Sequence, residues 1–222
     1  MKRATIIMAK VPRAGNVKTR LQPFLSAEQC VLLSEAFLED AINKAKGISE
    51  KLIIAFSPAD ERAYFDKFGD ENLILTEQKG SDLGERMCNA FQFALSQNSD
   101  SAVMIGTDSP TFPADYIEQA FEFLELETDA VLGKTADGGF YLIGLRKLNK
   151  EIFENVAWSS GKTFEQTYRN IMKSDLHLRE VPSWFDVDEK DDLLKLDEQF
   201  IFSRNAVRRA PKTFETLNRI LR

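Results

Sequence analysis

The sequence ATIIMAKVPRAGNVKTRL, residues 4–21, joins a short apolar run to a basic loop. Residues 4–9 are mostly apolar and partly β-branched, which predicts a strand. Residues 10–21 then place several cations around one glycine. Open α/β sheets bind ligands at the carboxyl ends of their strands, so this loop is the first candidate for a binding site.

Similar apolar runs recur along the chain, separated by segments with apolar residues at helical spacing. The expected strands are 4–9, 51–56, 72–76, 102–106, 129–133, 139–145 and 178–181, and the expected helices are 26–46, 58–68, 82–95, 113–126, 162–174, 189–203 and 211–221. Ser26 and Gln29 have the spacing of a capping box at the start of the first helix. Alternating strands and helices predict an α/β fold, a mostly parallel sheet covered by helices on both faces.

The pattern changes after residue 126. Residues 129–145, DAVLGKTADGGFYLIGL, place two strand-like runs around an Asp-Gly-Gly turn, which predicts an antiparallel hairpin within the parallel sheet. The chain contains no internal repeat, low-complexity tract or linker of Pro, Gly and Ser. We therefore expect one domain over residues 1–222.

Composition narrows the class of protein. The 222 residues include 29 Lys and Arg against 35 Asp and Glu, a net charge of −6, which argues against nucleic acid as a partner. Cys30 and Cys88 have no neighbouring Cys or His, which favours reduced thiols over a disulfide or a zinc site. Lys10 and Pro12 interrupt the first apolar run before it reaches signal-peptide length, and no later run approaches the length of a membrane span. The cytoplasm is the expected location, with no membrane partner.

The loop at 10–21 is suited to binding a polyphosphate. Its glycine lets backbone N–H groups approach a ligand closely, and its cations would neutralise phosphate charge in an otherwise acidic protein. A solvated basic loop is the simpler alternative. The residues concerned are Lys10, Arg13, Gly15, Lys18 and Arg20.

A second loop, GSDLGERM at residues 80–87, leads into a helix with Asp82 as its expected N-cap. Gly84 permits tight backbone geometry, and Arg86 stands in the first helical turn, within reach of a base or phosphate. A capped helix start explains the same residues.

Three acidic positions follow expected strands or turns. Asp108 follows the strand 102–106 and is suited to hold a divalent ion against phosphate oxygens. Asp188, with Asp186 two residues before it, offers a second carboxylate. Each has a simpler alternative, since either Asp108 or Asp188 could cap a following helix. Asp137 begins the Asp-Gly-Gly turn beside the same strand ends.

Six motifs occur in order along the chain: AKVPRAGNVKTRL, GSDLGERM, IGTDSP, DGGFYLIGL, Trp158-Ser159 with Glu165-Gln166-Thr167, and FDVDEKDDL. From residue 4 to about residue 200, this set resembles the bacterial glycosyltransferase-like family of the radical-SAM/selenodomain-associated type. That family lies within the nucleotide-diphospho-sugar transferase (GT-A) superfamily. The resemblance implies a three-layer α/β/α domain whose N-terminal half binds a nucleotide.

The resemblance also implies roles for individual residues. The nucleotide-binding residues would be Lys10, Gly15, Lys18, Thr19, Arg20, Gly84 and Arg86. Asp108 and Asp188 would hold Mg²⁺ or Mn²⁺. The acceptor would lie at Asp137, Gly138 and Gly139. Lys18 and Arg20 would offset the charge of the departing phosphate, and Asp137 would act as a base, which makes these three the expected catalytic residues.

The nature of the donor stays open. Gly106-Thr107-Asp108 offers one carboxylate where many glycosyltransferases of the superfamily carry Asp-X-Asp. The donor is therefore a nucleotide sugar or a nucleoside triphosphate, used with a small acceptor. A catalytically silent scaffold that binds a nucleotide or a partner protein is the competing class. RNA binding by the basic tail after Arg204 is opposed by the net charge, and the sequence leaves the oligomeric state open.

Overall fold

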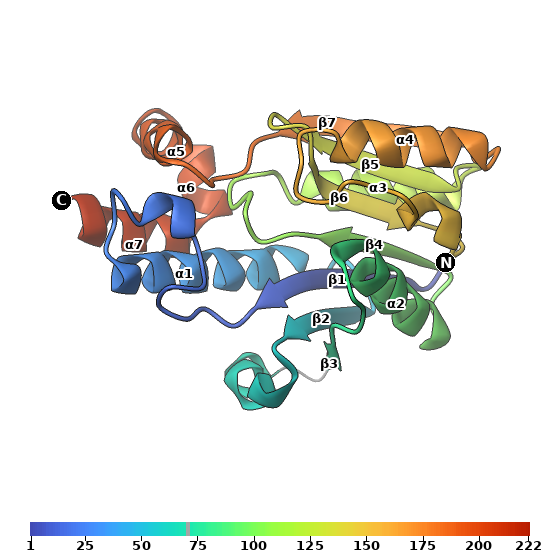
Figure 1. The fold of residues 1–222 in the computed structure, drawn as a ribbon, viewed down its shortest axis with the longest axis horizontal. Helices are drawn as coiled ribbons and strands as arrows, with labels where there is room; N and C mark the ends of the chain where they lie inside the picture. The colour runs from blue at the N-terminus through green and yellow to red at the C-terminus, as the bar shows by residue number, and fades with distance from the viewer. Residues whose placement is uncertain (70–71) are drawn as a thin grey trace.

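The computed structural model describes residues 1–69 and 72–222, which form a seven-stranded sheet packed between helices (Figure 1). The strands are β1 (Arg3–Lys10), β2 (Lys51–Ser57), β3 (Leu73–Glu77), β4 (Ser101–Ile105), β5 (Ala130–Thr135), β6 (Phe140–Leu145) and β7 (Leu178–Trp184). The α-helices are α1 (Ala27–Ala45), α2 (Leu83–Ser96), α3 (Asp115–Glu125), α4 (Thr163–Lys173), α5 (Lys190–Phe202), α6 (Arg204–Arg209) and α7 (Pro211–Leu221). Three 3-10 helices complete the described elements: η1 (Thr19–Leu21), η2 (Ala59–Phe68) and η3 (Lys150–Phe153).

The sheet is parallel except at one strand. Its order is β3-β2-β1-β4-β6-β5-β7, and β1 pairs in parallel with both β2 and β4. Strand β6 runs antiparallel to β4 and β5, whereas β7 is again parallel to β5. A turn of a few residues joins β5 to β6, and so short a connection can only produce an antiparallel pair. The predicted α/β fold with a late antiparallel element is therefore confirmed.

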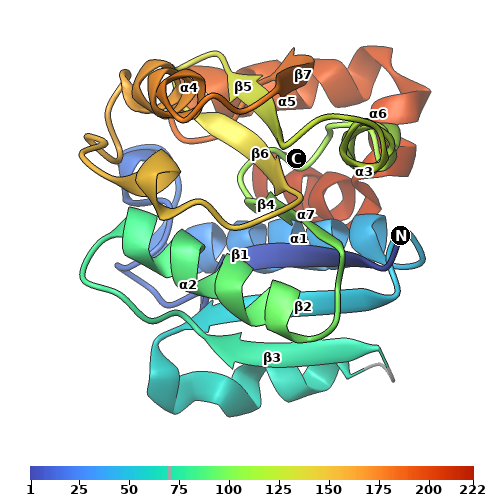
Figure 2. The same cartoon turned by 90° about the vertical axis from the view of Figure 1, so that its right-hand side faces the viewer.

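Side-chain alternation along the strands builds two cores. In β1, Ile7 belongs to a cluster shared with α1, η2 and α3, and its neighbour Ile6 belongs to a cluster shared with α2, η3 and α4. Figure 2 shows α2 in front of the sheet and α1 behind it. Because both faces are covered, the central parallel strands β1, β2 and β4 are mostly buried and apolar. Polar side chains therefore cluster at the carboxyl ends of the strands, beyond the apolar stretches.

The C-terminal helices add a third apolar cluster at one end of the molecule. There Leu33 and Phe37 of α1 pack against side chains of α5 and α7, and α7 runs alongside α1 in Figure 1. The buried carboxylate of Asp40 accepts hydrogen bonds from the main-chain N–H groups of Lys212 (3.1 Å) and Thr213 (2.8 Å) and from the Thr213 hydroxyl (2.7 Å). Asp40 thus caps the first turn of α7, which would otherwise leave N–H groups unpaired.

Helix starts were predicted well at two places. Ser26 and Gln29 form the expected capping box at α1, and the Asp82 side chain accepts from the Glu85 N–H at the start of α2. Asp188 was also considered as a cap, but Glu189 is the N-cap of α5 and Asp192 completes the capping box. The Asp188 side chain is therefore available for other contacts.

Other differences are local. The segment expected as a helix at 58–68 is the 3-10 helix η2, and the expected strand 178–181 extends to Trp184 as β7. Both cysteines are free and buried, as predicted. Within the described ranges, no helix combines the length and apolar character needed to cross a bilayer.

Candidate functional site

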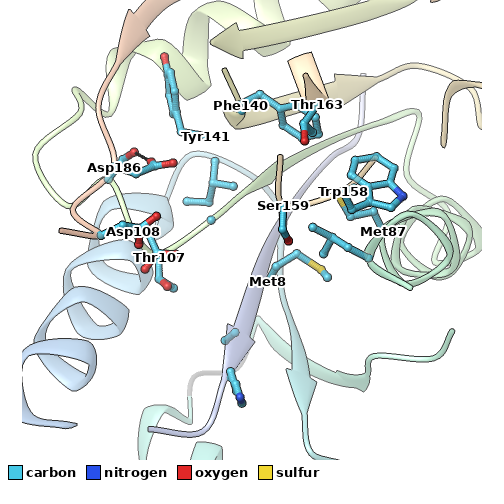
Figure 3. A pocket seen from close by; sticks show the side chains of 18 of the residues that line it. Met8, Met87, Thr107, Asp108, Phe140, Tyr141, Trp158, Ser159, Thr163 and Asp186 are labelled. Atoms are coloured by element: carbon cyan, nitrogen blue, oxygen red, sulfur yellow. Dashed lines mark hydrogen bonds between the residues drawn. The ribbon is translucent and has the colours of Figure 1, made fainter. Parts of the chain in front are cut away.

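A cavity of about 750 Å³ lies at the carboxyl edge of the parallel strands. Its walls include the ends of β1 and β4 with the loops after them, the start of β6, the first turn of α2 and the segment 158–161. In Figure 3, Asp108 and Asp186 lie on one side of the cavity, and Trp158 and Met87 lie on the other. The cavity therefore has an acidic end and an apolar end.

Lys18 is at the centre of the acidic end. Its ammonium donates to the carboxylates of Asp108 and Asp188, the latter at 3.0 Å. Only 7% of the Lys18 side chain is exposed, against 48% for Asp108 and 40% for Asp188. Burial alone lowers the pKa of Lys18, but its attraction to the two carboxylates raises that pKa overall above its ordinary value. The lysine is therefore a fixed positive charge between two acids.

Backbone geometry explains how these three side chains meet. Lys18 adopts a left-handed conformation (φ 46°) directly before η1. Asp108 follows β4, and its carbonyl oxygen accepts from the N–H of Val187 at 2.8 Å. That hydrogen bond places the segment carrying Asp188 against the loop carrying Asp108.

The other residues of the 10–21 loop divide into two groups. Lys10, Thr19 and Arg20 line the cavity. Lys10 donates to the Asn16 carbonyl oxygen at 3.1 Å, and Arg20 lies 3.6 Å from the Glu189 carboxylate. Arg13 and Gly15 are not in the cavity wall: Arg13 pairs with Glu61 at 2.7 Å, and Gly15 makes the turn with φ 81°.

Two residues at the start of α2, Gly84 and Arg86, have different surroundings. Arg86 lines the cavity and donates to the Gly80 carbonyl oxygen at 3.2 Å. Gly84 is covered by Trp158, since a Cβ at Gly84 would lie 2.6 Å from the indole nitrogen. A side chain at position 84 would collide with the indole, so this glycine is needed for packing.

A second acidic group lies beside the first. One carboxylate oxygen from each of Asp137, Asp186 and Asp188 lies within 4.8 Å of the others. Burial and the neighbouring carboxylates raise the pKa of Asp186 to about 7, although the Ser109 hydroxyl donates to it. Such a concentration of carboxylates is stabilised by a bound cation.

The turn 136–139 holds Asp137 in place. Its Oδ1 accepts from the Thr135 hydroxyl at 2.5 Å and from the Gly139 N–H at 3.0 Å. Asp137 and Gly139 line the cavity. Gly138 instead packs on the backbone of Gly161, where a Cβ would lie 2.2 Å from the carbonyl oxygen. Of the three expected acceptor residues, Asp137 and Gly139 therefore line the cavity, whereas Gly138 packs against Gly161.

Sequence reasoning missed much of the apolar end. Met8, Met87, Phe140 and Trp158 line the cavity, and the Phe140 and Trp158 rings meet edge to face at 6.5 Å. Periodicity marked these residues only as parts of strands and helices or, for Trp158, as part of a motif. Gln78 was missed as well: its amide nitrogen donates to the carbonyl oxygens of Ala9 (3.0 Å) and Ala55 (2.8 Å) beside the cavity.

The fold is shared with solved structures of nucleotidyl- and sugar-transferases. A protein-family model described as "Uncharacterized protein conserved in bacteria (DUF2064)" matches residues 31–160, and the chain belongs to that family. No curated protein matches the sequence.

Solved structures share the fold over nearly the whole chain. A protein of Desulfovibrio desulfuricans G20, provisionally described as a nucleotide-diphospho-sugar transferase, is 28% identical over 99% of this chain and 95% of its own, with a TM-score of 0.89. A 4-diphosphocytidyl-2C-methyl-D-erythritol synthase from Anaerococcus prevotii DSM 20548 is 12% identical over 90% and 96%, with a TM-score of 0.60. A CMP-2-keto-3-deoxy-manno-octonic acid synthetase complexed with CTP is 11% identical over 91% and 99%, with a TM-score of 0.56. The last two establish similarity of fold.

Proposed function

We propose that the protein is a metal-dependent transferase that takes a nucleotide donor and passes a glycosyl or nucleotidyl group to a small acceptor. The observation that carries this proposal is the convergence of Asp108 and Asp188 on one cation, the Lys18 ammonium, at the wall of the cavity. Two carboxylates that already share a cation form a suitable donor set for a divalent ion. We also propose that the protein is of the radical-SAM/selenodomain-associated type that its six sequence motifs resemble.

The metal fits the residues present. Asp108 and Asp188 supply hard oxygen ligands, which Mg²⁺ and Mn²⁺ prefer, and the carboxyl groups of Asp137 and Asp186 lie close to that of Asp188. Lys18 would be displaced from the two carboxylates when the ion binds. When bound, such an ion supplies a Lewis acid that draws charge from the phosphate oxygens.

The donor's phosphates would lie against the basic loop. Lys10, Thr19 and Arg20 line the cavity next to Lys18, and Arg86 lines it from α2. Lysine and arginine side chains in these positions orient the phosphates and stabilise the negative charge on the departing group. Gly15 shapes the loop from outside the cavity wall, and Gly84 supports Trp158.

The acceptor would lie near the turn 136–139. Asp137 is the proposed base, which would take a proton from an acceptor hydroxyl at the oxygen that does not bond Thr135 and Gly139. Gly139 lines the cavity and Gly138 fixes the turn against Gly161.

Two donors are consistent with this arrangement. Similarity to the described nucleotide-diphospho-sugar transferase supports a nucleotide sugar. The single carboxylate in Gly106-Thr107-Asp108 supports a nucleoside triphosphate. In the first case the leaving group is a nucleoside diphosphate, and in the second it is pyrophosphate.

Thermal unfolding with a panel of ligands tests the proposal. Nucleoside triphosphates and nucleotide sugars are each added with Mg²⁺ or Mn²⁺, and again with EDTA. A ligand at a hundred times its Kd stabilises the fold by about 2.7 kcal/mol, which raises the Tm of a chain of this size by roughly 5 to 10 °C. A metal-dependent shift with one ligand class identifies the donor. If no nucleotide shifts the Tm with either metal, the proposal is wrong.

A further inference from the structure

The Lys18 ammonium has an unusual environment for a lysine in a ligand-binding loop. It lies between two carboxylates and 5.3 Å from the centre of the Phe37 ring, with almost no exposure to solvent. Asp108 and Asp188 themselves remain partly exposed at the cavity wall. The cation is therefore enclosed, whereas its two partners stay accessible to a ligand.

The two carboxylates come from segments far apart in the chain, but the Asp108–Val187 hydrogen bond holds those segments together. Lys18 comes from a third segment, the basic loop. That loop is held to the rest of the protein near Lys18 by a sulfur contact from Cys30 to the Lys18 carbonyl oxygen at 3.6 Å. The main-chain segments that carry the two aspartates are therefore joined without the lysine.

We propose that Lys18 stands in for the divalent cation in the ligand-free protein and leaves the carboxylates when metal and nucleotide bind together. This inference rests on the proposed function, because it takes the carboxylate pair as the metal site. A metal ion alone must displace the ammonium, and the displaced ammonium gains no new partner. Metal ions that arrive with nucleotide phosphates bring anions to which the ammonium transfers.

The physical consequence is coupling between the two ligands. A positive charge between the carboxylates competes directly with Mg²⁺ or Mn²⁺ for the same oxygens. Phosphates beside the basic loop relieve this competition, so each ligand strengthens binding of the other. The free protein therefore binds metal weakly, and the cavity accepts the metal as part of a nucleotide complex.

Titration of the protein with Mn²⁺ alone tests the inference. The electron paramagnetic resonance signal of unbound Mn²⁺ reports binding, and no turnover is needed. Lys18→Met keeps much of the side-chain length but removes the charge. We expect it to bind Mn²⁺ about ten-fold or more tightly than the wild type, within the 5- to 150-fold range of typical coupling between ligands. Lys18→Arg retains the charge and is expected to show no such gain. Lys10→Met is the matched control, because Lys10 lines the cavity but bonds the Asn16 carbonyl oxygen.

The order of affinities should reverse for the metal–nucleotide complex. A Mn²⁺–nucleoside triphosphate complex should bind more weakly to Lys18→Met than to the wild type, because the variant has no ammonium to contact the phosphates. Circular dichroism checks that each variant is folded, and Lys18→Gln serves as a second neutral variant if Lys18→Met is not.

The outcomes separate this inference from the proposed function. If neutral variants bind Mn²⁺ no more tightly than the wild type, Lys18 is only a structural ion pair and the inference is overturned. If they gain Mn²⁺ affinity but no triphosphate or nucleotide-sugar complex binds to any variant, the stand-in role holds and the proposed transferase function fails.

Discussion

The N–H of Val187 donates to the carbonyl oxygen of Asp108 at 2.8 Å. This hydrogen bond joins the loop after β4 to the segment that leads into α5. Asp188 then follows directly, and its carboxylate meets that of Asp108 at the Lys18 ammonium. This backbone contact, together with the hydrogen bond from the Ser109 hydroxyl to Asp186, joins distant parts of the chain at the acidic end of the cavity.

Replacing Asp108 tests which carboxylates hold the metal. Asp108→Asn keeps the shape of the side chain and removes its charge. A bound ligand raises the free energy of unfolding more with metal than with EDTA. We expect this difference to fall by about 1.4 kcal/mol or more in the variant, which corresponds to a ten-fold loss of affinity. Thermal unfolding with and without EDTA measures this difference directly.

Asp137→Asn is the companion variant, because Asp137 belongs to the neighbouring acidic group but does not contact Lys18. It should reduce turnover with little change in metal-dependent stabilisation. The reverse result, with Asp137 needed for metal binding and Asp108 dispensable, would place the ion between Asp137, Asp186 and Asp188 instead.

Gly84→Ala tests the packing of Trp158. The new Cβ would lie 2.6 Å from the indole nitrogen, so the indole or the start of α2 must move. We expect a loss of about 1–3 kcal/mol in the free energy of unfolding, as for other overpacked sites. Chemical denaturation measures it.

The control for that variant is Gly106→Ala, because no described atom lies within 4 Å of a Cβ there. In the double variant Gly84→Ala, Trp158→Ala, the clash is gone, and its cost should be smaller than the sum of the two single changes. Strict additivity would count against a direct contact between the two positions.

Lys44 gives the stability a distinct pH dependence. Its ammonium donates to the Pro110 carbonyl oxygen at 2.7 Å and lies 3.7 Å from the centre of the Phe112 ring. Burial lowers the pKa of Lys44 to about 7, in spite of the nearby Asp40 carboxylate. The folded state therefore binds fewer protons than the unfolded state between about pH 7 and the ordinary lysine pKa near 10.4.

The free energy of unfolding should consequently rise with pH across that window. The contribution of Lys44 has a slope of up to about 1.4 kcal/mol per pH unit. Lys44→Met should lose this contribution, and the exposed Lys173→Met should keep it. Urea denaturation from pH 7 to pH 10 gives the comparison, and identical slopes for Lys44→Met and the wild type would contradict the lowered pKa.

Asp40→Ala tests the attachment of the C-terminal helix. The change removes the acceptor for two N–H groups and one hydroxyl at the start of α7. We expect a loss of about 2–3 kcal/mol in the free energy of unfolding, because buried donors are left unpaired. Hydrogen exchange should increase first in α7, and an unchanged exchange rate there would argue against the capping role. Thr213→Val, which removes only the hydroxyl, should cost less.

Local sequence patterns predicted the fold well because the relevant signals are local. The apolar, partly β-branched run at residues 4–9, the Ser26–Gln29 capping box and the Asp-Gly-Gly turn each depend on neighbours in the chain. Asp188 was harder to interpret, since Asp188 and Glu189 are both suitable caps for α5 and only the structure places Glu189 there.

The site was predictable only in part, because its contacts join residues that are far apart in the sequence. A cation-rich loop and Asp108 could be located from their positions after apolar runs, but no spacing rule brings Lys18 between Asp108 and Asp188. That contact depends on the hydrogen bond between the main chains of Val187 and Asp108. Trp158 was missed as a wall of the cavity because its contact with Gly84 joins segments that are distant in sequence.

Anomalous diffraction from a crystal grown with Mn²⁺ and the nucleotide that most raises the Tm would test the central claim most directly. We predict one manganese peak at coordination distance from both Asp108 and Asp188, with the nucleotide phosphates beside the 10–21 loop and Lys18 moved from the carboxylates to the phosphates. A cavity without nucleotide, or a manganese peak elsewhere with Lys18 still bonded to Asp108 and Asp188, would contradict the account.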